Sequence, residues 1–185
     1  MKKLCTALIL CLVSIMAQGQ YIKEIGSYVS CDEEHSIMAT NPEESAEFLT
    51  FILAADNQTF LSVTSRDLVH FRQTLLLVKE KYVEWKNVAI DNNVSYDVKE
   101  FPYTFPTCRV GWPSNGKFVA SKLLSLTPSF LVYEGKCKMF IMEDVTSENN
   151  ETKKFVWKFC SEKDFDSLIY FLDADVIKKS FKENK

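Results

Sequence analysis

One long amphipathic stripe constrains the fold of this chain more than any other feature. Apolar residues recur at spacings of three and four over residues 68–89, which places them along one side of a helix of about six turns. The stripe consists of Leu68, Phe71, Leu75, Val78, Tyr82, Trp85 and Ala89. A helix with one apolar side needs another layer to cover it. We therefore expect Phe71 and Trp85 to be buried against a sheet and His70, off the stripe, to be solvated.

Short β-prone segments surround this helix. They cover residues 21–30, 48–54 and 59–63 before it, and residues 95–100, 105–112, 118–126, 129–133, 137–144 and 154–160 after it. Between the first two segments we expect a polar loop at residues 32–35 and a short helical turn at residues 41–44.

Two of the strands lead into helices in the same way. Thr64 is followed by Asp67, and Ser161 by Asp164, so each strand ends in a hydroxyl N-cap with an acid three residues later. The plan predicts an α+β fold, in which an antiparallel sheet carries one long amphipathic helix and a shorter C-terminal helix.

The first 19 residues have the pattern of a cleaved signal peptide. Lys2 and Lys3 precede an apolar run over residues 4–16, and Ala17 and Gly19 supply the small residues at the cleavage site. An uncleaved anchor is the alternative. We expect residues 20–185 to form a single α+β domain that is secreted or periplasmic, without stable membrane insertion, because no later stretch is long and apolar enough to cross a bilayer.

The charge balance argues against two classes of partner. The full chain has 22 basic and 25 acidic residues, and removal of Lys2 and Lys3 leaves a net charge of about −5. Nucleic acids and anionic membrane surfaces both attract basic patches, so neither is an expected partner. The C-terminal lysines form a local basic end, interpreted as a solvated tail: Lys178, Lys179, Lys182 and Lys185.

Four cysteines remain after residue 19, namely Cys31, Cys108, Cys137 and Cys160. An even number in an oxidising compartment favours disulfides, and three pairings are possible. A hairpin folded about Asn149-Asn150 would place Met139 roughly opposite Cys160 and Cys137 about one diagonal step away, which leaves Cys31 with Cys108. No spacing is CxxC, so neither a zinc ribbon nor a thioredoxin-like site is supported.

Motifs for catalysis or cofactors are few. Four glycines after residue 19 cannot build a phosphate loop, and the chain has neither HExxH nor GxSxG, so we expect no cofactor and no metal. His35 lies beside Asp32, Glu33 and Glu34, which allows a cation site or a general base for a cysteine nucleophile. A solvated acidic loop and structural disulfides are the simpler interpretations.

An aromatic and proline-rich segment follows the long helix, over residues 101–113. Proline cannot donate to a sheet ladder, which suits an edge or an entry to a sheet. Phe101, Tyr103, Phe105 and Trp112 could form a contact surface for a protein, a glycan or a small apolar ligand. The alternative is that these rings cover the core, because aromatic side chains are usually buried.

Three stretches also carry a resemblance: residues 62–68, the segment Lys81-Tyr82-Val83-Glu84-Trp85-Lys86-Asn87-Val88-Ala89, and Phe105-Pro106-Thr107. They resemble a group of small exported bacterial proteins of unassigned function with KY-x-EW-x-x-x-A and F-P segments. The resemblance implies a bacterial origin and an envelope or secreted location. It implies no active site.

These features together predict an exported, non-catalytic binding or interaction protein. Two other functions remain open, a small secreted hydrolase that uses carboxylates or the His35 region, and a carrier that encloses an apolar ligand. A deep pocket with converging polar groups would favour the hydrolase, a closed apolar cavity the carrier, and a flat aromatic patch the interaction protein.

Overall fold

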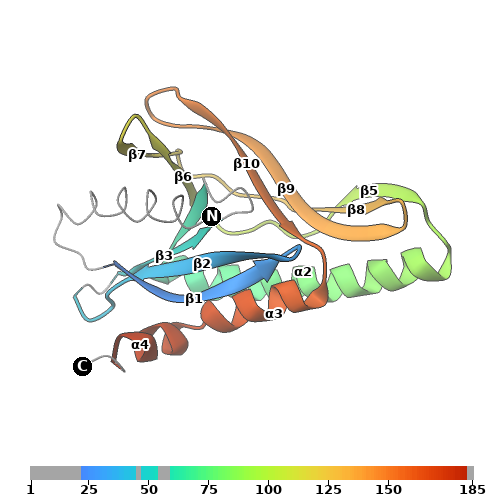
Figure 1. Cartoon of the computed structure of the whole chain (residues 1–185), viewed down its shortest axis with the longest axis horizontal. Coiled ribbons are helices and arrows are strands. Elements are labelled where there is room, and N and C mark those ends of the chain that lie inside the picture. Colours follow the sequence, from blue (N-terminus) through green and yellow to red (C-terminus); the bar gives the residue numbers. More distant parts are fainter. Residues whose placement is uncertain (1–21, 45–46, 54–58, 183–185) are drawn as a thin grey trace.

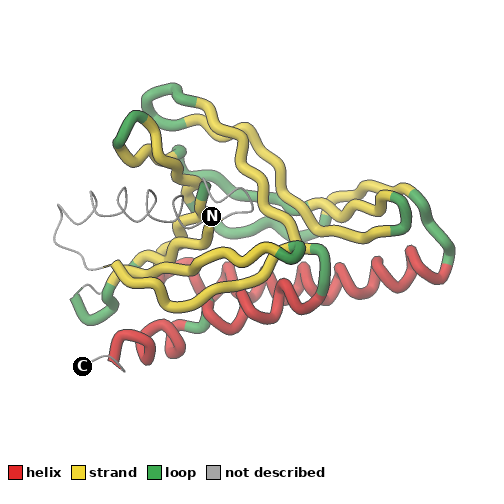
Figure 2. Tube along the Cα trace, viewed as in Figure 1, coloured by secondary structure: helices red, strands yellow, loops and turns green. Residues whose placement is uncertain are grey.

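The computed structural model describes residues 22–44, 47–53 and 59–182. The predicted signal peptide lies outside these residues. The described chain is α+β, with two antiparallel sheets and three helices, as expected from the strand-into-helix pattern. Figure 2 shows the helices along one side of the molecule and the strands on the other.

The first sheet has six strands in the order β1-β2-β3-β4-β6-β7. Its members are β1 (Ile22–Ser30), β2 (Glu33–Thr40), β3 (Leu49–Leu53), β4 (Phe60–Thr64), β6 (Arg109–Ser114) and β7 (Lys117–Ala120). The predicted strand at residues 48–54 is buried on both faces, because Ile52 faces the main core while Phe51 and Leu53 join a second apolar cluster. Its predicted partner, β4, pairs with it in antiparallel register.

The second sheet has four strands in the order β10-β9-β8-β5. They are β5 (Tyr96–Glu100), β8 (Ser129–Tyr133), β9 (Lys136–Thr146) and β10 (Thr152–Phe159). The predicted hairpin about Asn149-Asn150 is confirmed, since Thr146 pairs with Thr152. The turn between β8 and β9 places Glu134 and Gly135 at positive φ, which suits a two-residue hairpin turn.

The long helix is α2 (Ser65–Asp91), and its N-cap is Thr64, whose hydroxyl accepts from the backbone N–H of Asp67 at 3.3 Å. Six of the seven stripe residues are buried as predicted, and His70 is exposed. Trp85 differs because it is only half-buried. Its ring stacks on that of Phe101. The ammonium group of Lys99, which belongs to β5 of the second sheet, lies 4.2 Å from the centroid of the Trp85 ring.

Two short helices end the described chain, α3 (Glu162–Phe171) and α4 (Ala174–Lys182). The predicted C-terminal helix is therefore followed by another, and Lys178, Lys179 and Lys182 lie on α4 rather than in a solvated tail. Ile177 and Phe181 anchor α4 to the rest of the protein, because both side chains are buried in the main core. The ring of Phe171 lies so close to Gly26 that a Cβ there would meet it at 2.2 Å, so β1 needs glycine at this position for α3 to pack.

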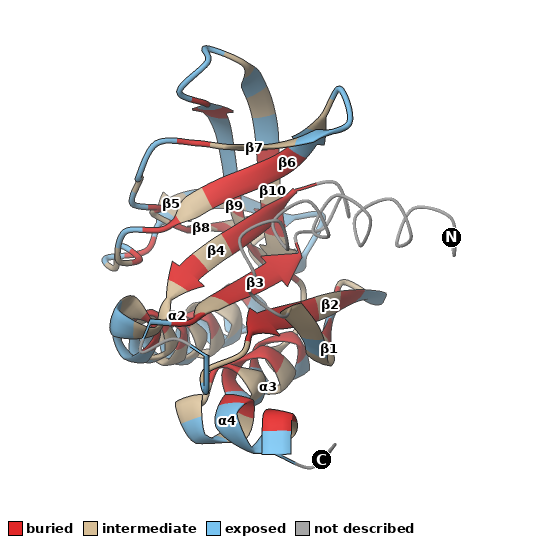
Figure 3. Ribbon diagram, turned by 90° about the vertical axis from the view of Figure 1, so that its left-hand side faces the viewer, coloured by how far each residue is buried: buried red, intermediate tan, exposed pale blue. Residues whose placement is uncertain are grey.

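The core fills the space between the sheets and the helices (Figure 1). Aromatic rings dominate it: Trp157 packs against Phe71, Phe105 and Phe159, with centroids 5.0–6.1 Å apart. Figure 3 shows that buried residues gather on β2, β3, β4 and β6 in the middle of the first sheet. Within the described residues, none of the helices has the length and apolar character that a membrane crossing requires.

One loop prediction was wrong. Residues 33–35 belong to β2, and only Cys31 and Asp32 form the turn between β1 and β2. Both turn residues have positive φ, 49° and 69°, as a two-residue hairpin turn of type I′ requires.

The short helical turn expected at residues 41–44 is a turn without a helix. The backbone N–H of Glu44 donates to the Asn41 carbonyl at 3.2 Å.

The strand bounds around the proline-rich segment also differ from the prediction. β6 begins at Arg109 rather than residue 105, and β7 ends at Ala120 rather than residue 126. Residues 101–108 and the segment after β7 are not paired in ladders. Isolated contacts connect them, such as the bridge between Cys108 and Leu124. Pro102 and Pro106 have no backbone N–H, which explains why the ladder starts after them.

Candidate functional site

A disulfide joins two segments that are far apart in the described sequence. Cys31 in the β1–β2 turn bonds to Cys160, which lies between β10 and α3, at a sequence separation of 129. Cys108 and Cys137 are free thiols. The expected pairs Cys137–Cys160 and Cys31–Cys108 are therefore wrong.

The register of the β9–β10 hairpin explains the error. Met139 pairs with Phe159, so the ladder, if continued, would place Cys160 opposite Lys138. Cys137 then lies on the face of Met139, and Cys160 on the opposite face. The sequence-based hairpin placed Met139 opposite Cys160, one residue away, and a shift of one residue moves every side chain to the other face.

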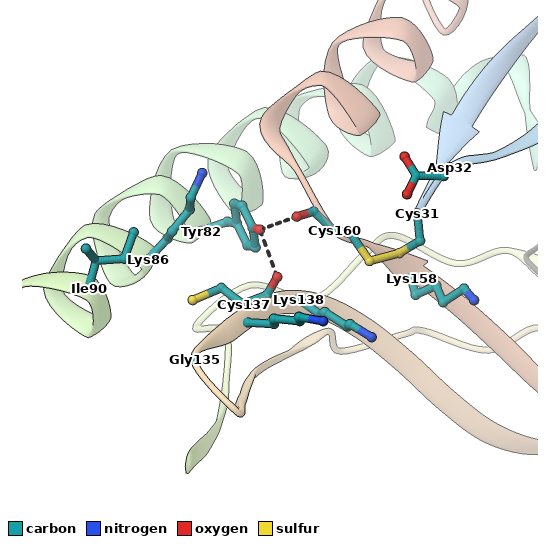
Figure 4. Close-up of a pocket in the computed structure, with 11 residues that line it drawn as sticks. Cys31, Asp32, Tyr82, Lys86, Ile90, Gly135, Cys137, Lys138, Lys158 and Cys160 are labelled. Carbon is teal, nitrogen blue, oxygen red and sulfur yellow. Dashed lines mark hydrogen bonds between the residues drawn. A yellow bond between two sulfur atoms is a disulfide. The ribbon is translucent and has the colours of Figure 1, made fainter. Parts of the chain in front are cut away.

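The disulfide lines a pocket of about 510 Å³ (Figure 4). The pocket lies where β10 turns away from β9 towards α3, and α2 forms its other side. Its lining combines three cysteines, four lysines and the ring of Tyr82. The lysines are Lys86, Lys136, Lys138 and Lys158.

Tyr82 lines this pocket from α2 and connects two of its walls by hydrogen bonds. Its stripe position on α2 directs the ring into the core, and its hydroxyl lies 3.1 Å from the carbonyl oxygen of Cys137 and 2.9 Å from that of Cys160. The hydroxyl can therefore donate to either carbonyl and connects β9 with the start of the α3 segment. Burial raises the pKa of the Tyr82 phenol, so the group stays protonated and acts as a donor.

A buried carboxylate supports the disulfide from the side of α3. Asp164 accepts hydrogen bonds from the backbone N–H groups of Cys31, at 3.0 Å, and Cys160, at 2.8 Å. The same side chain also accepts from the hydroxyl of Ser161. The predicted capping box is not formed at Ser161. This residue is the N-cap of α3, but its hydroxyl donates to the Asp164 carboxylate instead of accepting from the backbone N–H of Asp164, and the carboxylate binds the disulfide backbone.

Three of the lysines share one side of the pocket. Lys136 and Lys138 are two residues apart on β9 and so point to the same face, and Lys158 on β10 pairs with Phe140 on that face. Figure 4 shows Lys138 and Lys158 extending in the same direction below the disulfide. In the described part of the chain, no ion pair is formed by any of these three lysines.

The fourth lysine and the nearby acid are placed differently. Lys86 points away from the other lysines in Figure 4, and its ammonium pairs with Glu162 at 3.3 Å. The side chain of Asp32 points away from Lys138 and Lys158 in the same view. Lys136, Lys138 and Lys158, which we name the lysine triad, therefore give one side of the pocket a positive charge.

The sulfur groups at the pocket are poorly suited to attack. The pKa of the Cys137 thiol is raised, chiefly by burial and against the opposing effect of Lys86. Cys108 lies in the core away from the pocket, and burial raises its pKa to about 12. Because the thiolate is the nucleophile, both cysteines are held in their less reactive form near neutral pH.

The aromatic residues proposed as a contact surface lie mostly inside the protein. Phe101, Phe105 and Trp112 are 2%, 1% and 3% exposed and belong to the core, and Tyr103 is half-buried against it. They follow the alternative interpretation, in which the rings cover the core. Only Tyr103 keeps accessible surface for a partner.

The His35 region does not converge on an accessible site. His35 is 1% exposed on β2, with its ring centroid 5.3 Å from that of Tyr28, whereas Glu33 and Glu34 are exposed. Among the residues described, no group of three or more histidine, cysteine, aspartate or glutamate side chains is placed to hold a metal ion.

The lysine triad was not predicted from the sequence. The alternation Lys136-Cys137-Lys138 in a strand was a visible signal, because it places two lysines on one face. Lys158 could be added only once the hairpin register was known.

A comparison with known protein families, curated proteins and solved structures finds no match. The resemblance to exported bacterial proteins therefore stays a prediction.

Proposed function

We propose that this protein is a non-catalytic binding protein that works outside the cytoplasm and receives an anionic group of its ligand in the pocket beside the disulfide. The observation that carries the proposal is the lysine triad, whose three members line one side of the pocket and form no ion pair within the described residues. Like charges on neighbouring side chains repel one another, so an anion that binds among them lowers the electrostatic free energy of the folded protein.

The surroundings of the triad favour binding over chemistry. The pocket offers cations, a protonated phenol that is already hydrogen-bonded, and cysteines that are either oxidised or of raised pKa. The alternative carrier function has less support, because rings such as Phe71, Phe105 and Trp157 fill the space between sheet and helix. An extracytoplasmic location is supported by the disulfide, since such bonds persist in oxidising compartments.

The test is a titration with small anions. Sodium phosphate and sodium citrate, added at constant ionic strength, should shift the amide NMR signals of residues 136–138 and 158–160 in a saturable manner. The double variant Lys138→Gln/Lys158→Gln should weaken binding by about tenfold or more, because it removes two of the three charges.

A matched control separates the pocket from the total charge. Lys117→Gln/Lys154→Gln removes the same charge from two exposed lysines outside the pocket and should leave the affinity within about twofold. Equal losses in the two double variants, or the absence of saturable shifts in the native protein, would contradict an anion site.

A further inference from the structure

The four-stranded sheet has an inner face and an outer face, and pairing registers define both. Phe130, Met139, Trp157 and Phe159 are buried on the inner face, towards α2, where the ring of Phe130 contacts that of Tyr82. The alternate residues of the same strands point to the opposite side. We name that side the outer face.

Apolar and basic side chains lie beside each other on the outer face. Two adjacent rows run across β5, β8 and β9, and each row consists of two apolar residues followed by a lysine. The rows are Tyr96, Tyr133 and Lys136, and then Val98, Leu131 and Lys138. Further along the hairpin, Phe140 pairs with Lys158 and Met142 pairs with Val156. The lysine triad therefore lies beside both groups of apolar side chains.

Four of these apolar side chains are exposed, and Leu131, Phe140 and Val156 are half-buried. Tyr96 is 67% exposed, Tyr133 56% and Met142 54%, and Val98 is also exposed. Single exposed apolar residues are common, but adjacent ones on a sheet face are typical of an interaction surface. Aromatic residues and methionine in particular are enriched where proteins bind each other.

We propose that the outer face is the docking surface for an acidic, apolar segment of a partner protein, which lays its apolar side chains over Tyr133 and Met142 and directs its carboxylates to the lysine triad. This proposal rests on the proposed function, since it names the ligand class of that pocket. The pocket and the outer face are continuous, because Lys136, Lys138 and Lys158 belong to both.

Charge complementarity selects this occupant. The whole chain carries a net charge of −3, so a basic strip on it is a local feature that attracts an acidic partner. A second copy docked face to face would bring its own lysine triad against the first, which like charges oppose. A polyanionic glycan would use the lysines but would leave Tyr96, Tyr133 and Met142 without apolar contacts.

The experiment is selection from a library of random peptides displayed on phage, with the oxidised protein as the target. We expect enrichment of sequences that combine aspartate or glutamate with aromatic or aliphatic residues. A synthetic peptide of the enriched sequence should bind Tyr133→Ala/Met142→Ala about tenfold more weakly or worse than the native protein.

The control variant is Val69→Ala/Tyr170→Ala, which removes two equally exposed apolar side chains from the helices and should bind the peptide as the native protein does. Both variants change surface positions, and their circular dichroism spectra should match the native spectrum. No enrichment, enrichment of basic sequences, or equal effects of the two variants would overturn the docking surface. Binding of heparin in place of any peptide would overturn it as well.

The two proposals fail in different ways. Tyr133→Ala/Met142→Ala leaves the lysine triad intact and should bind citrate as the native protein does. Saturable citrate binding without enrichment of acidic peptides removes the docking surface and leaves the anion site. The absence of citrate binding to the native protein removes the anion site itself.

Discussion

At the scale of single residues, Asp164 carries the most demanding position. Its carboxylate is buried, and a buried charge is tolerated only where hydrogen bonds replace its hydration. The backbone N–H groups of Cys31 and Cys160 supply two of these bonds. Asp164 therefore ties the β1–β2 turn to the start of α3 independently of the sulfur–sulfur bond.

Asp164→Asn should lower the free energy of unfolding by roughly 1–3 kcal/mol, because hydrogen bonds to a charged acceptor are stronger than those to a neutral one. The oxygen that accepts from both backbone N–H groups can remain, but an NH2 group replaces the oxygen that accepts from Ser161. Urea denaturation of the oxidised protein measures the change. The control is Asp166→Asn on the same helix, whose exposed carboxylate pairs with Lys79 and should contribute less than about 1 kcal/mol. Equal losses would show that the negative charge of the buried carboxylate adds nothing to these bonds.

The thiols give a second prediction at this scale. In the native protein a thiol reagent should modify Cys137 faster than Cys108, because Cys137 lies at the pocket and Cys108 is buried with a pKa of about 12. The Cys137 rate should rise as pH increases, since its pKa is raised and the thiolate reacts. In the chain without residues 1–19, two thiols should react under denaturing conditions, and non-reducing peptide mapping should recover a Cys31–Cys160 peptide. Four reactive thiols, or any other bridged peptide, would contradict the structure.

At the scale of elements, α2 organises both sheets. Its buried stripe contacts the second sheet through Tyr82 and Phe71, whose rings pack on Phe130 and Trp157. The same helix lies against β3 and β4 of the first sheet. One continuous helix of 27 residues can reach both sheets, because each residue adds about 1.5 Å of length.

Phe71→Ala should lower the free energy of unfolding by roughly 3–5 kcal/mol, because it leaves a cavity among aromatic rings. Its neighbour His70 is exposed, so His70→Ala should change stability by less than about 0.5 kcal/mol. Trp85→Ala should fall between the two, since that ring is half-buried. Chemical denaturation monitored by far-ultraviolet circular dichroism provides the comparison, and equally mild effects at Phe71 and His70 would show that the stripe does not face the core.

Elements whose signal is local could be predicted from the sequence. The helix stripe behind Thr64 and the strands that end in turn residues such as Glu134-Gly135 depend on neighbours a few residues away. The β1–β2 hairpin could not be predicted, because Cys31-Asp32 is an unusual pair for a turn with two positive φ angles. Two features depended on strand register, namely which lysines share a face in the lysine triad and which cysteine can reach Cys31. A shift of one residue moves each side chain to the opposite face of the sheet, so a register that is uncertain by one residue leaves both features undecided.

At the scale of the whole molecule, buried phenols connect distant layers. The hydroxyl of Tyr28 on β1 donates to the carbonyl of Leu53 on β3 and accepts from the indole N–H of Trp157 on β10. Tyr82 connects α2 with the second sheet. Both sheets and the long helix are thus joined through groups that bind these neighbours as neutral phenols.

Stability should fall in alkaline solution. Burial raises the pKa of both Tyr28 and Tyr82, so above about pH 10 the unfolded chain loses protons that the folded protein keeps. Each phenol should then lower the free energy of unfolding by up to about 1.4 kcal/mol per pH unit, whereas below pH 9 neither contributes a slope. Urea unfolding between about pH 8 and pH 11 tests this, and Tyr82→Phe should reduce the slope. A free energy that stays constant through this range would contradict the burial of neutral phenols.

The bond between Cys31 and Cys160 closes most of the described chain into a covalent ring. The strands from β2 to β10 and the helix α2 lie within that ring, whereas β1, α3 and α4 extend outside it. A protease that cuts once at an exposed turn, such as the one at Asn149-Asn150, therefore releases no fragment. The cut ends stay tethered at a high effective concentration and can keep their strand pairing. The nicked protein separates into two pieces only after a reductant opens the ring.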